Sequence, residues 1–469
     1  MIACAVFRAE SRGSRMITGF DFGTSNCAMG VMKDGQVQLL NIEGNKAFMP
    51  STLYALDREF ITEHVAQQLT HEEQRASFIK ERANALNRAK RVRQEEGFSI
   101  DEPSVFVGQA GLDEYFAWPG EGYFVKSPKS FLGASGLQAA SIAFFEDVVT
   151  AMMMAVKSRS EAILNDTITH TVIGRPVNFQ GLNAEQSNAQ AIAILTAAAK
   201  RAGFKDVAFL YEPIGAALSF EQGLEQDKTV LVMDVGGGTT DCAMVRMGPS
   251  HRGNDDRQQD FIGHTGERIG GNDLDIQLAG QCLMPLFGML STLKNGLPMP
   301  TAPYWNAVRT NDVGALAEFN GKDTALLLKQ LMLDTTEPDL LQRFIDLRND
   351  KQNHHVVRSA EQAKIALSSD LEHWVDLSYL EADLGRDVNR AQYAKTIQRP
   401  LQKMIALMQE AIHQAGTRPD LIFITGGSGQ SPILRAAIQS QLGDIDIVDG
   451  DHFGSVASGL TVWANRVFA

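Results

Sequence analysis

Two segments of the chain repeat one run of residue types that could bind phosphate. Residues 20–29 read Phe-Asp-Phe-Gly-Thr-Ser-Asn-Cys-Ala-Met, and residues 233–244 read Met-Asp-Val-Gly-Gly-Gly-Thr-Thr-Asp-Cys-Ala-Met. Each run predicts an apolar strand that ends at an aspartate, a tight turn, and a second strand. Glycine has no Cβ, so the backbone amides of such a turn can come close to phosphate oxygens. Two copies of the turn could grip one nucleotide from opposite sides.

Three aspartates accompany these turns: Asp21, Asp234 and Asp241. A carboxylate repels phosphate, so its natural role is to hold a hydrated Mg²⁺ that bridges phosphates, because Mg²⁺ keeps several waters and takes few carboxylates. One glycine-rich turn is equally typical of an ordinary hairpin, and it is the duplication that favours nucleotide binding. The sequence contains no GxxxxGK[ST] motif and no GxGxxG motif after a strand. These absences exclude the P-loop and Rossmann classes.

The elements that must position these turns follow from hydrophobic patterning. The first turn lies in an antiparallel meander whose next turn carries the strong hairpin signal Asp34-Gly35. Farther along, strands alternate with helices, and Asn183 and Gly203 are typical start and stop signals of one helix. The segment 60–96 predicts polar helices. Strands are expected at 16–22, 26–32, 37–41, 168–173, 207–210, 374–380 and 421–425, and a long helix at 390–415.

The composition limits the classes of partner. A net charge of −13 disfavours nucleic acid and anionic membranes, which require a basic surface. The four cysteines show no CxxC spacing, which suits a reducing cytosol. No apolar run approaches the ~18 residues that span a bilayer, and residues 1–15 are too short and interrupted for a signal peptide. We therefore expect a cytoplasmic protein with no nucleic-acid or membrane partner and with an N-terminal extension at 1–15.

The motifs resemble, in order, those of the actin-like ATPase superfamily and, within it, the nucleotide-binding domain of DnaK-type heat-shock chaperones. The resemblance covers most of the chain from residue 16 onward. Its most specific block is the segment 361–369, Glu-Gln-Ala-Lys-Ile-Ala-Leu-Ser-Ser, because sugar kinases and actins lack that helix signature. The other blocks are Gly19–Asn26, Lys129–Gly133, Glu212–Ala217, Asp234–Asp241, Gly270–Asp275 and Thr425–Gly427.

The resemblance implies an α/β chain with the actin-like ATPase fold: two lobes of duplicated ribonuclease-H-like topology with inserted outer subdomains. The core of lobe I would comprise 16–45 and 115–227, and its outer insertion 46–114. The core of lobe II would comprise 228–270 and 371–469, and its outer subdomain 271–370. Both outer segments are longer than the family pattern, which suits partner binding or altered nucleotide exchange and equally suits neutral elaboration.

The resemblance also implies ATP and Mg²⁺ as ligands, with roles assigned by position. Glu212 would orient the attacking water, and Lys129 would reach the γ-phosphate and stabilise the charge that develops in phosphoryl transfer. Asp21 and Asp234 would hold magnesium through water, and Asp241 would order those waters. Thr239 and Asp241 complete the implied catalytic set. The phosphates would be held by Gly23, Thr24, Ser25, Asn26, Gly236, Gly237, Gly238 and Thr239, and the nucleoside by Glu361, Lys364, Ser368, Gly426 and Gly427.

Each assignment has a simpler alternative. Glu212 could be an acid at a helix N-terminus, favoured by the helix dipole. Lys129 could be a surface lysine, and Lys126 is the alternative register for the γ-phosphate lysine. Glu361 and Lys364 are spaced i, i+3 and could form an ion pair on a helix surface.

Two departures from the family bear on function. Gln430 stands where the family stacks an arginine on adenine, which forfeits on the order of 1 kcal/mol, so we expect weaker ATP binding than in the chaperones. We also expect no interdomain linker and no β-sandwich for peptide substrates. The leading hypothesis is a monomeric, slow, Mg²⁺-dependent ATPase switch that binds ATP and ADP and acts on an unidentified protein partner.

Three other classes of function stay open. A small-molecule kinase could use the same scaffold, although the sequence carries no sugar-kinase signature. A filament subunit would bury exposed apolar loops between protomers. A nucleotide-binding regulator without turnover would fit the substitution at Gln430.

Overall fold

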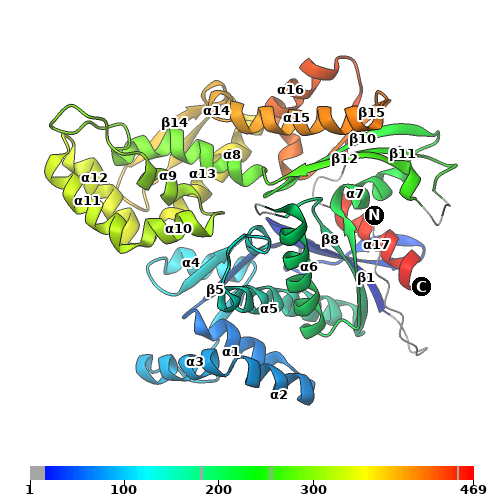
Figure 1. Ribbon diagram of the computed structural model, residues 1–469, viewed down its shortest axis with the longest axis horizontal. Helices are drawn as coiled ribbons and strands as arrows, with labels where there is room; N and C mark the ends of the chain where they lie inside the picture. The colour runs from blue at the N-terminus through cyan, green and yellow to red at the C-terminus, as the bar shows by residue number, and fades with distance from the viewer. Residues whose placement is uncertain (1–15, 180–182, 253, 255–256, 451–453) are drawn as a thin grey trace.

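The computed structural model has two lobes, one above the other in Figure 1, each built on a β-sheet covered by helices. The structure describes residues 16–179, 183–252, 254, 257–450 and 454–469. The expected extension at 1–15 lies outside the described residues.

The sheet of lobe I has the strand order β3-β2-β1-β8-β9, and β4 pairs with β2. The first three strands form the predicted antiparallel meander, whereas β8 and β9 run parallel to β1. Asp34 and Gly35 join β2 to β3 with φ of 51° and 78°, as the Asp-Gly signal predicts. The strands are β1 (Met16–Phe22), β2 (Asn26–Lys33), β3 (Gln36–Leu39), β4 (Met49–Pro50), β8 (Ile168–Arg175) and β9 (Asp206–Tyr211).

The sheet of lobe II repeats this plan, in the order β12-β11-β10-β15-β16. Its first three strands are again antiparallel neighbours, and β15 and β16 again run parallel to the first strand. The predicted duplicated topology is therefore confirmed. The strands are β10 (Lys228–Val235), β11 (Thr240–Met247), β12 (Phe261–Glu267), β15 (Leu421–Thr425) and β16 (Ile447–Asp449).

Two helices cross between the lobes. Helix α7 (Glu212–Glu221) leaves lobe I and packs on β10 and β11, whereas α17 (Ser455–Phe468) leaves lobe II and packs on β1 and β8, as Figure 1 shows. The sequence placed 371–469 in the core of lobe II, but the structure packs its last helix against the sheet of lobe I. The two helices also contact each other and share a buried apolar core between the sheets, separate from the core of each lobe.

The crossing requires a very close approach of α7 and α17. A Cβ on Gly459 would lie 1.6 Å from the carbonyl oxygen of Gly215. Replacing Gly459 with alanine must push the helices apart and is expected to destabilise the protein by about 3 kcal/mol. Calorimetric melting would show the loss, and the adjacent Ser458→Ala variant is the control. An unchanged melting temperature in Gly459→Ala would contradict the packing.

The outer part of lobe I is a small sheet with helices around it, at the lower left of Figure 1. The polar helices predicted at 60–96 are present as α1, α2 and α3. The elements are β5 (Thr52–Ala55), β6 (Val105–Val107), β7 (Tyr123–Lys126), η1 (Pro128–Phe131), α1 (Glu59–Gln68), α2 (Glu72–Glu81), α3 (Ala83–Glu96) and α4 (Gln109–Ala117). Helices α5 (Ala139–Leu164) and α6 (Ala184–Arg201) pack on each other and on β2 and β9 of the main sheet.

Helix α5 is long and apolar enough, by length and composition alone, to cross a membrane. The sequence reading found no such run. Core helices pass the same test, and Val148 and Met152 of α5 are fully buried in the core of lobe I. Asp147 of α5 is also buried and binds the guanidinium of Arg82 at 3.1 Å. Helix α5 is therefore a core helix of lobe I.

The outer part of lobe II is mostly helical. The predicted helix 390–415 is two helices, because Pro400 has no N–H to bond Thr396, where the first helix ends. The strand expected at 374–380 is β13 (Glu372–Asp376). The remaining elements are η2 (Gln258–Asp260), α8 (Gly271–Leu278), η3 (Ala279–Leu283), η4 (Met284–Phe287), α9 (Ala302–Val308), α10 (Val313–Asn320), α11 (Lys322–Asp334), α12 (Pro338–Asn349), α13 (Asn353–Ser369), β14 (Gly385–Asn389), α14 (Arg390–Thr396), α15 (Gln398–Ala415), η5 (Gly427–Gln430) and α16 (Pro432–Leu442).

Candidate functional site

The two glycine-rich turns meet tip to tip between the lobes. A Cβ on Gly237 would lie 1.9 Å from Ser25 Oγ, and a Cβ on Gly238 would lie 2.7 Å from Thr24 Cγ2. Residues implied to hold phosphates, far apart in the chain, therefore form one site. The rest of that set lies in the same two turns: Gly23 accepts a hydrogen bond from Ser51 Oγ, Asn26 opens β2, and Gly236 N–H donates to Thr239 O.

Asp21 and Asp234 lie at the ends of the strands that lead into the turns, β1 and β10, and Asp241 lies at the start of β11, which leaves the second turn. Asp234 and Asp241 are opposite each other in the β10–β11 register. Burial, together with the negative charge of Glu212, raises the pKa of Asp21 and of Asp241 to about 7. The same two causes raise the pKa of Asp234, and the charges of Asp241 and Asp21 add to the effect. The charge of Asp21, in lobe I, thus reaches Asp234, in lobe II, across the lobe boundary.

Lys129 and Glu212 form a buried ion pair beside these carboxylates. Lys129, in η1, is 5% exposed and also donates to Gly174 O at 3.4 Å, so the alternative of a surface lysine is wrong. Burial alone would lower the pKa of Lys129, but the charges of Glu212 and Asp21 outweigh it and raise that pKa. Glu212 is the first residue of α7, so it is an acid at a helix N-terminus, as the simpler alternative proposes. Its side chain also faces the site, where it binds Lys129. Lys126, the alternative register, lies elsewhere and binds Glu361.

The carboxylates fit a water-mediated magnesium better than a directly bound metal. Among the described residues, no three His, Cys, Asp or Glu side chains converge to ligate a metal ion. Asp241 Oδ1 accepts from Val177 N–H at 2.8 Å, but the buried Oδ2 finds no hydrogen-bond partner in the described part of the chain. A buried acceptor of this kind suits a metal-bound water, because Mg²⁺ retains its waters and takes few carboxylates.

The residues implied to hold the nucleoside lie on α13 and face both lobes. Glu361 binds Lys126 of lobe I at 2.9 Å and Arg358 at 2.9 Å. Burial opposes the effect, but Lys126 and Arg358 lower the pKa of Glu361. Lys364 binds Asp275 at 2.8 Å. The simple i, i+3 pair of Glu361 with Lys364 is therefore wrong, since each has a different partner. Ser368 Oγ donates within α13, to Lys364 O at 3.3 Å.

The opposite wall is the end of β15. Gly426 has φ of 81°, and a Cβ there would lie 2.3 Å from Val235 O. Gly427 opens η5, and Gln430 ends it. A Cβ on Gly271 would lie 2.6 Å from Ser428 Oγ, so α8 and the Gly-Gly turn are in contact.

The lobes are closed in this structure. The cavity between the turns has a volume of about 10 Å³, enough for one water molecule at most. At the outer rim, Tyr115 Oη donates to Lys351 O at 2.9 Å, and the rings of Tyr115 and His354 lie 5.9 Å apart. A nucleotide would therefore have to separate the lobes to enter.

Two arginines at the site escaped the sequence reading. Arg175 ends β8, and its guanidinium lies 4.8 Å from the centre of the Tyr211 ring. Burial lowers the pKa of Arg175, and the negative charges of Glu212 and Asp241 oppose that effect. Arg268 follows β12 and lines the cavity between the turns. The only available signal was their position, directly before Pro176 and shortly before the Gly270–Gly271 pair.

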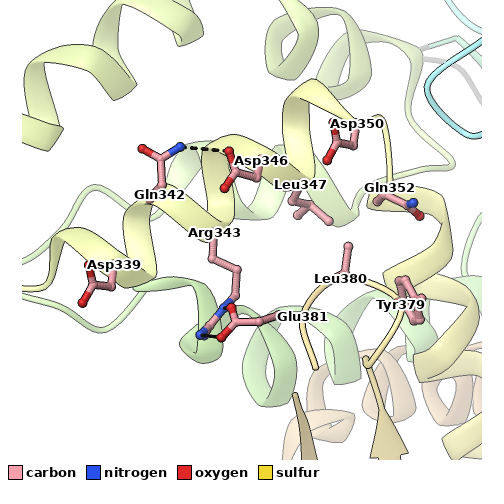
Figure 2. Close-up of a pocket in the computed structure, with 10 residues that line it drawn as sticks. All are labelled: Asp339, Gln342, Arg343, Asp346, Leu347, Asp350, Gln352, Tyr379, Leu380 and Glu381. Atoms are coloured by element: carbon pink, nitrogen blue, oxygen red, sulfur yellow. Dashed lines mark hydrogen bonds and ion pairs between the residues drawn. The ribbon is translucent and has the colours of Figure 1, made fainter. Parts of the chain in front are cut away.

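A roomier cavity lies far from these turns, between α12 and the loop that joins β13 to β14 (Figure 2). Its rim carries Asp339, Asp346 and Asp350, and Arg343 is bound by Glu381 at 2.6 Å. None of the residues implied for catalysis or nucleotide binding lines it, so the candidate site is the junction of the two turns.

Comparisons with known proteins agree with this geometry. A family model described as Hsp70 protein matches residues 130–282 and 326–465. The chaperone protein dnaK3 of Thermosynechococcus vestitus is 22% identical over 454 residues, which are 93% of this chain and 53% of that protein. The chaperone protein DnaK of Thermus thermophilus is 25% identical over 447 residues, which are 91% of this chain and 56% of that protein.

The chain thus spans about half the length of the curated relatives it matches. The matched segments contain Glu212, the second turn, α13 and the Gly426–Gly427 pair. The family model covers more than half of the chain, and the duplicated sheets have the actin-like ATPase fold of that family. The chain belongs to the Hsp70 family.

Proposed function

We propose that this protein is a Mg²⁺- and ATP-dependent switch that hydrolyses ATP slowly and signals to a protein partner. The observation that carries the proposal is the tip-to-tip contact of the two turns beside the buried Lys129–Glu212 pair. Chaperone relatives in the same family support it. A finer resemblance, to the chaperone-like protein YegD, rests on the sequence motifs and belongs to this proposal.

The chemistry follows from the groups at the junction. Backbone amides of both turns would bind the β- and γ-phosphates, and magnesium, held through water by Asp21 and Asp234, would neutralise phosphate charge. Glu212 would orient a water toward the γ-phosphorus, and Lys129 would stabilise the charge on the phosphoryl oxygens. Since the closed cavity has no room for a nucleotide, each cycle would open and close the lobes, and the outer subdomains would carry that motion to the partner.

The first test is direct. Titration calorimetry with Mg-ATP and Mg-ADP measures binding, and phosphate release under single-turnover conditions measures hydrolysis. We expect both, with weaker ATP binding than in the chaperone relatives because of Gln430. Absence of Mg-ATP binding would refute the proposal. Binding without phosphate release would favour a regulator without turnover, and release only with an added sugar or polyol would favour a kinase.

The close contact between the two turns leads to a prediction about ATP affinity. Gly237→Ala would place a Cβ against Ser25, whereas a Cβ on Gly223 would meet Phe220 O at an ordinary 3.7 Å. We expect the Gly237→Ala variant to bind ATP at least about tenfold more weakly, a cost of about 1.4 kcal/mol, because its lobes cannot close. Gly223→Ala, at an exposed position outside the site, is the matched control and should bind normally. Equal ATP affinity in the two variants would contradict closure on the nucleotide.

The protein partner can be identified because its binding should depend on which nucleotide is bound. A pull-down from cell extract in Mg-ATP and in Mg-ADP should recover different proteins, because the outer subdomains move with lobe closure. Proteins captured equally in both states would argue against a switch.

A further inference from the structure

The cavity between the turns is surrounded by hydrogen-bond donors. Thr24, Ser130 and Thr239 bring hydroxyl groups, and Lys129 and Arg268 bring positive charge. None of its lining residues is acidic. Donors and cations of this kind suit an oxyanion, such as the end of a polyphosphate chain.

The two cations at this cavity differ in how far they are already neutralised. Lys129 is committed to Glu212, in an ion pair whose side chains are 4% and 11% exposed. Arg268 has no carboxylate within ion-pair distance in the described part of the chain, although its charge acts on Asp273 and opposes the effect of burial, which raises the pKa of that carboxyl. The buried Nε of Arg268 finds no hydrogen-bond partner among the described residues. Arg268 is thus the less neutralised of the two cavity-lining cations, and its Nε is a donor that remains available.

The position of Arg268 is set by the outer subdomain of lobe II. Its Nη2 donates to the carbonyl oxygen of Asn311 at 2.5 Å, in the loop between α9 and α10. Asn311 also reaches Asp273 of α8, at 3.5 Å. The guanidinium is therefore anchored from lobe II, whereas Lys129 reaches the same cavity from lobe I.

We propose that Arg268 binds the terminal phosphate of ATP and stabilises the charge that develops there during transfer to water. The inference rests on the proposed function. In that step the water oxygen forms a bond to the γ-phosphorus and the bond to the bridging oxygen breaks. The bonding pair stays on ADP, and the water proton leaves with the products. Arg268 exchanges neither protons nor electrons, and its planar fork binds two phosphoryl oxygens.

The test compares Arg268→Gln with Arg309→Gln, which removes the same charge from an exposed site at the end of α9. Mg-ATP and Mg-ADP affinities, single-turnover phosphate release and melting temperature are measured for each. In Arg268→Gln we expect ATP affinity to fall about tenfold and phosphate release about a hundredfold. ADP affinity should stay within twofold and the melting temperature should hold. Arg268→Lys should recover part of the ATP affinity, and Arg309→Gln should behave as wild type.

The outcomes separate this inference from the proposed function. If Arg268→Gln has the same ratio of ATP to ADP affinity as the wild type, and the same rate of phosphate release, the proposed role of Arg268 is wrong. The proposed switch function would then still stand. Equal loss of ATP and ADP binding, or a lowered melting temperature, would assign Arg268 a structural role and also overturn it. If the wild type binds without hydrolysing, the affinity ratio alone decides. If the wild type does not bind Mg-ATP, both proposals fall.

Discussion

Replacing Glu212 with glutamine is expected to lower the single-turnover rate of ATP hydrolysis by at least about a hundredfold while ATP still binds. Glutamine keeps the shape of the side chain but carries no negative charge. It therefore cannot neutralise Lys129, and it cannot orient water as a carboxylate does. The loss should appear in the rate rather than in affinity, because no part of Glu212 lies in the turns that hold the phosphates. Rapid-quench phosphate release together with calorimetry separates the two quantities.

Glu225 offers a matched control, since it lies just beyond the same helix and is exposed. The Glu225→Gln variant should hydrolyse and bind ATP as the wild type does. If Glu212→Gln retained the wild-type rate, the water-orienting role would be wrong, and the carboxylate would serve only to neutralise Lys129.

The second large effect concerns stability and pH. Burial first, and the charge of Glu212 next, raise the pKa of Asp241 from its ordinary 3.8 to about 7. Over this interval the folded protein holds a proton that the unfolded chain releases, so stability is greatest at low pH and falls as pH rises toward 7. Each pKa unit corresponds to about 1.4 kcal/mol, so the loss between pH 5 and pH 7 is on the order of 2–3 kcal/mol.

Asp241→Asn removes this titration and keeps the acceptor for Val177 N–H. We expect the nucleotide-free variant to melt at a higher temperature than the wild type at pH 8, and the difference to vanish near pH 5. Magnesium with ATP should stabilise the wild type at pH 8 and stabilise the variant much less. A wild-type melting temperature that does not fall between pH 5 and pH 8 would contradict the raised pKa.

Asp227 provides the contrasting control. It is exposed, and its hydrogen bonds from Ser250 lower its pKa. Its titration is complete well below pH 5, so Asp227→Asn should shift the melting temperature by the same amount across the whole range from pH 5 to pH 8.

The sequence predicted the features that local patterns encode. The repeated aspartate and glycine turns predicted the first meander and the hairpin that opens the second, and Asn183, Asp34 and Gly35 marked turns and caps where the structure has them. The spacing of Lys129 to Gly133 selected the buried lysine over Lys126. These signals work because a turn or a cap is decided by residues within a few positions of one another.

The features that escaped prediction depend on contacts between distant segments. Arg175 and Arg268 carry no pattern of their own, and only the fold brings them beside the turns. The placement of α17 on the sheet of lobe I likewise follows from long-range packing, such as the approach of Gly459 to Gly215. Pro400 is local to the predicted helix 390–415, and its missing N–H accounts for the break between α14 and α15.

The exchange of helices between the lobes has a consequence for biosynthesis. Strand β1 leaves the ribosome long before the helix that covers one of its faces, α17, which is made after the whole of the second sheet. The first lobe therefore cannot complete its packing as an independent unit during translation, and its apolar face stays open until α17 has been made. Nascent chains of this protein should depend on protection from aggregation until that point.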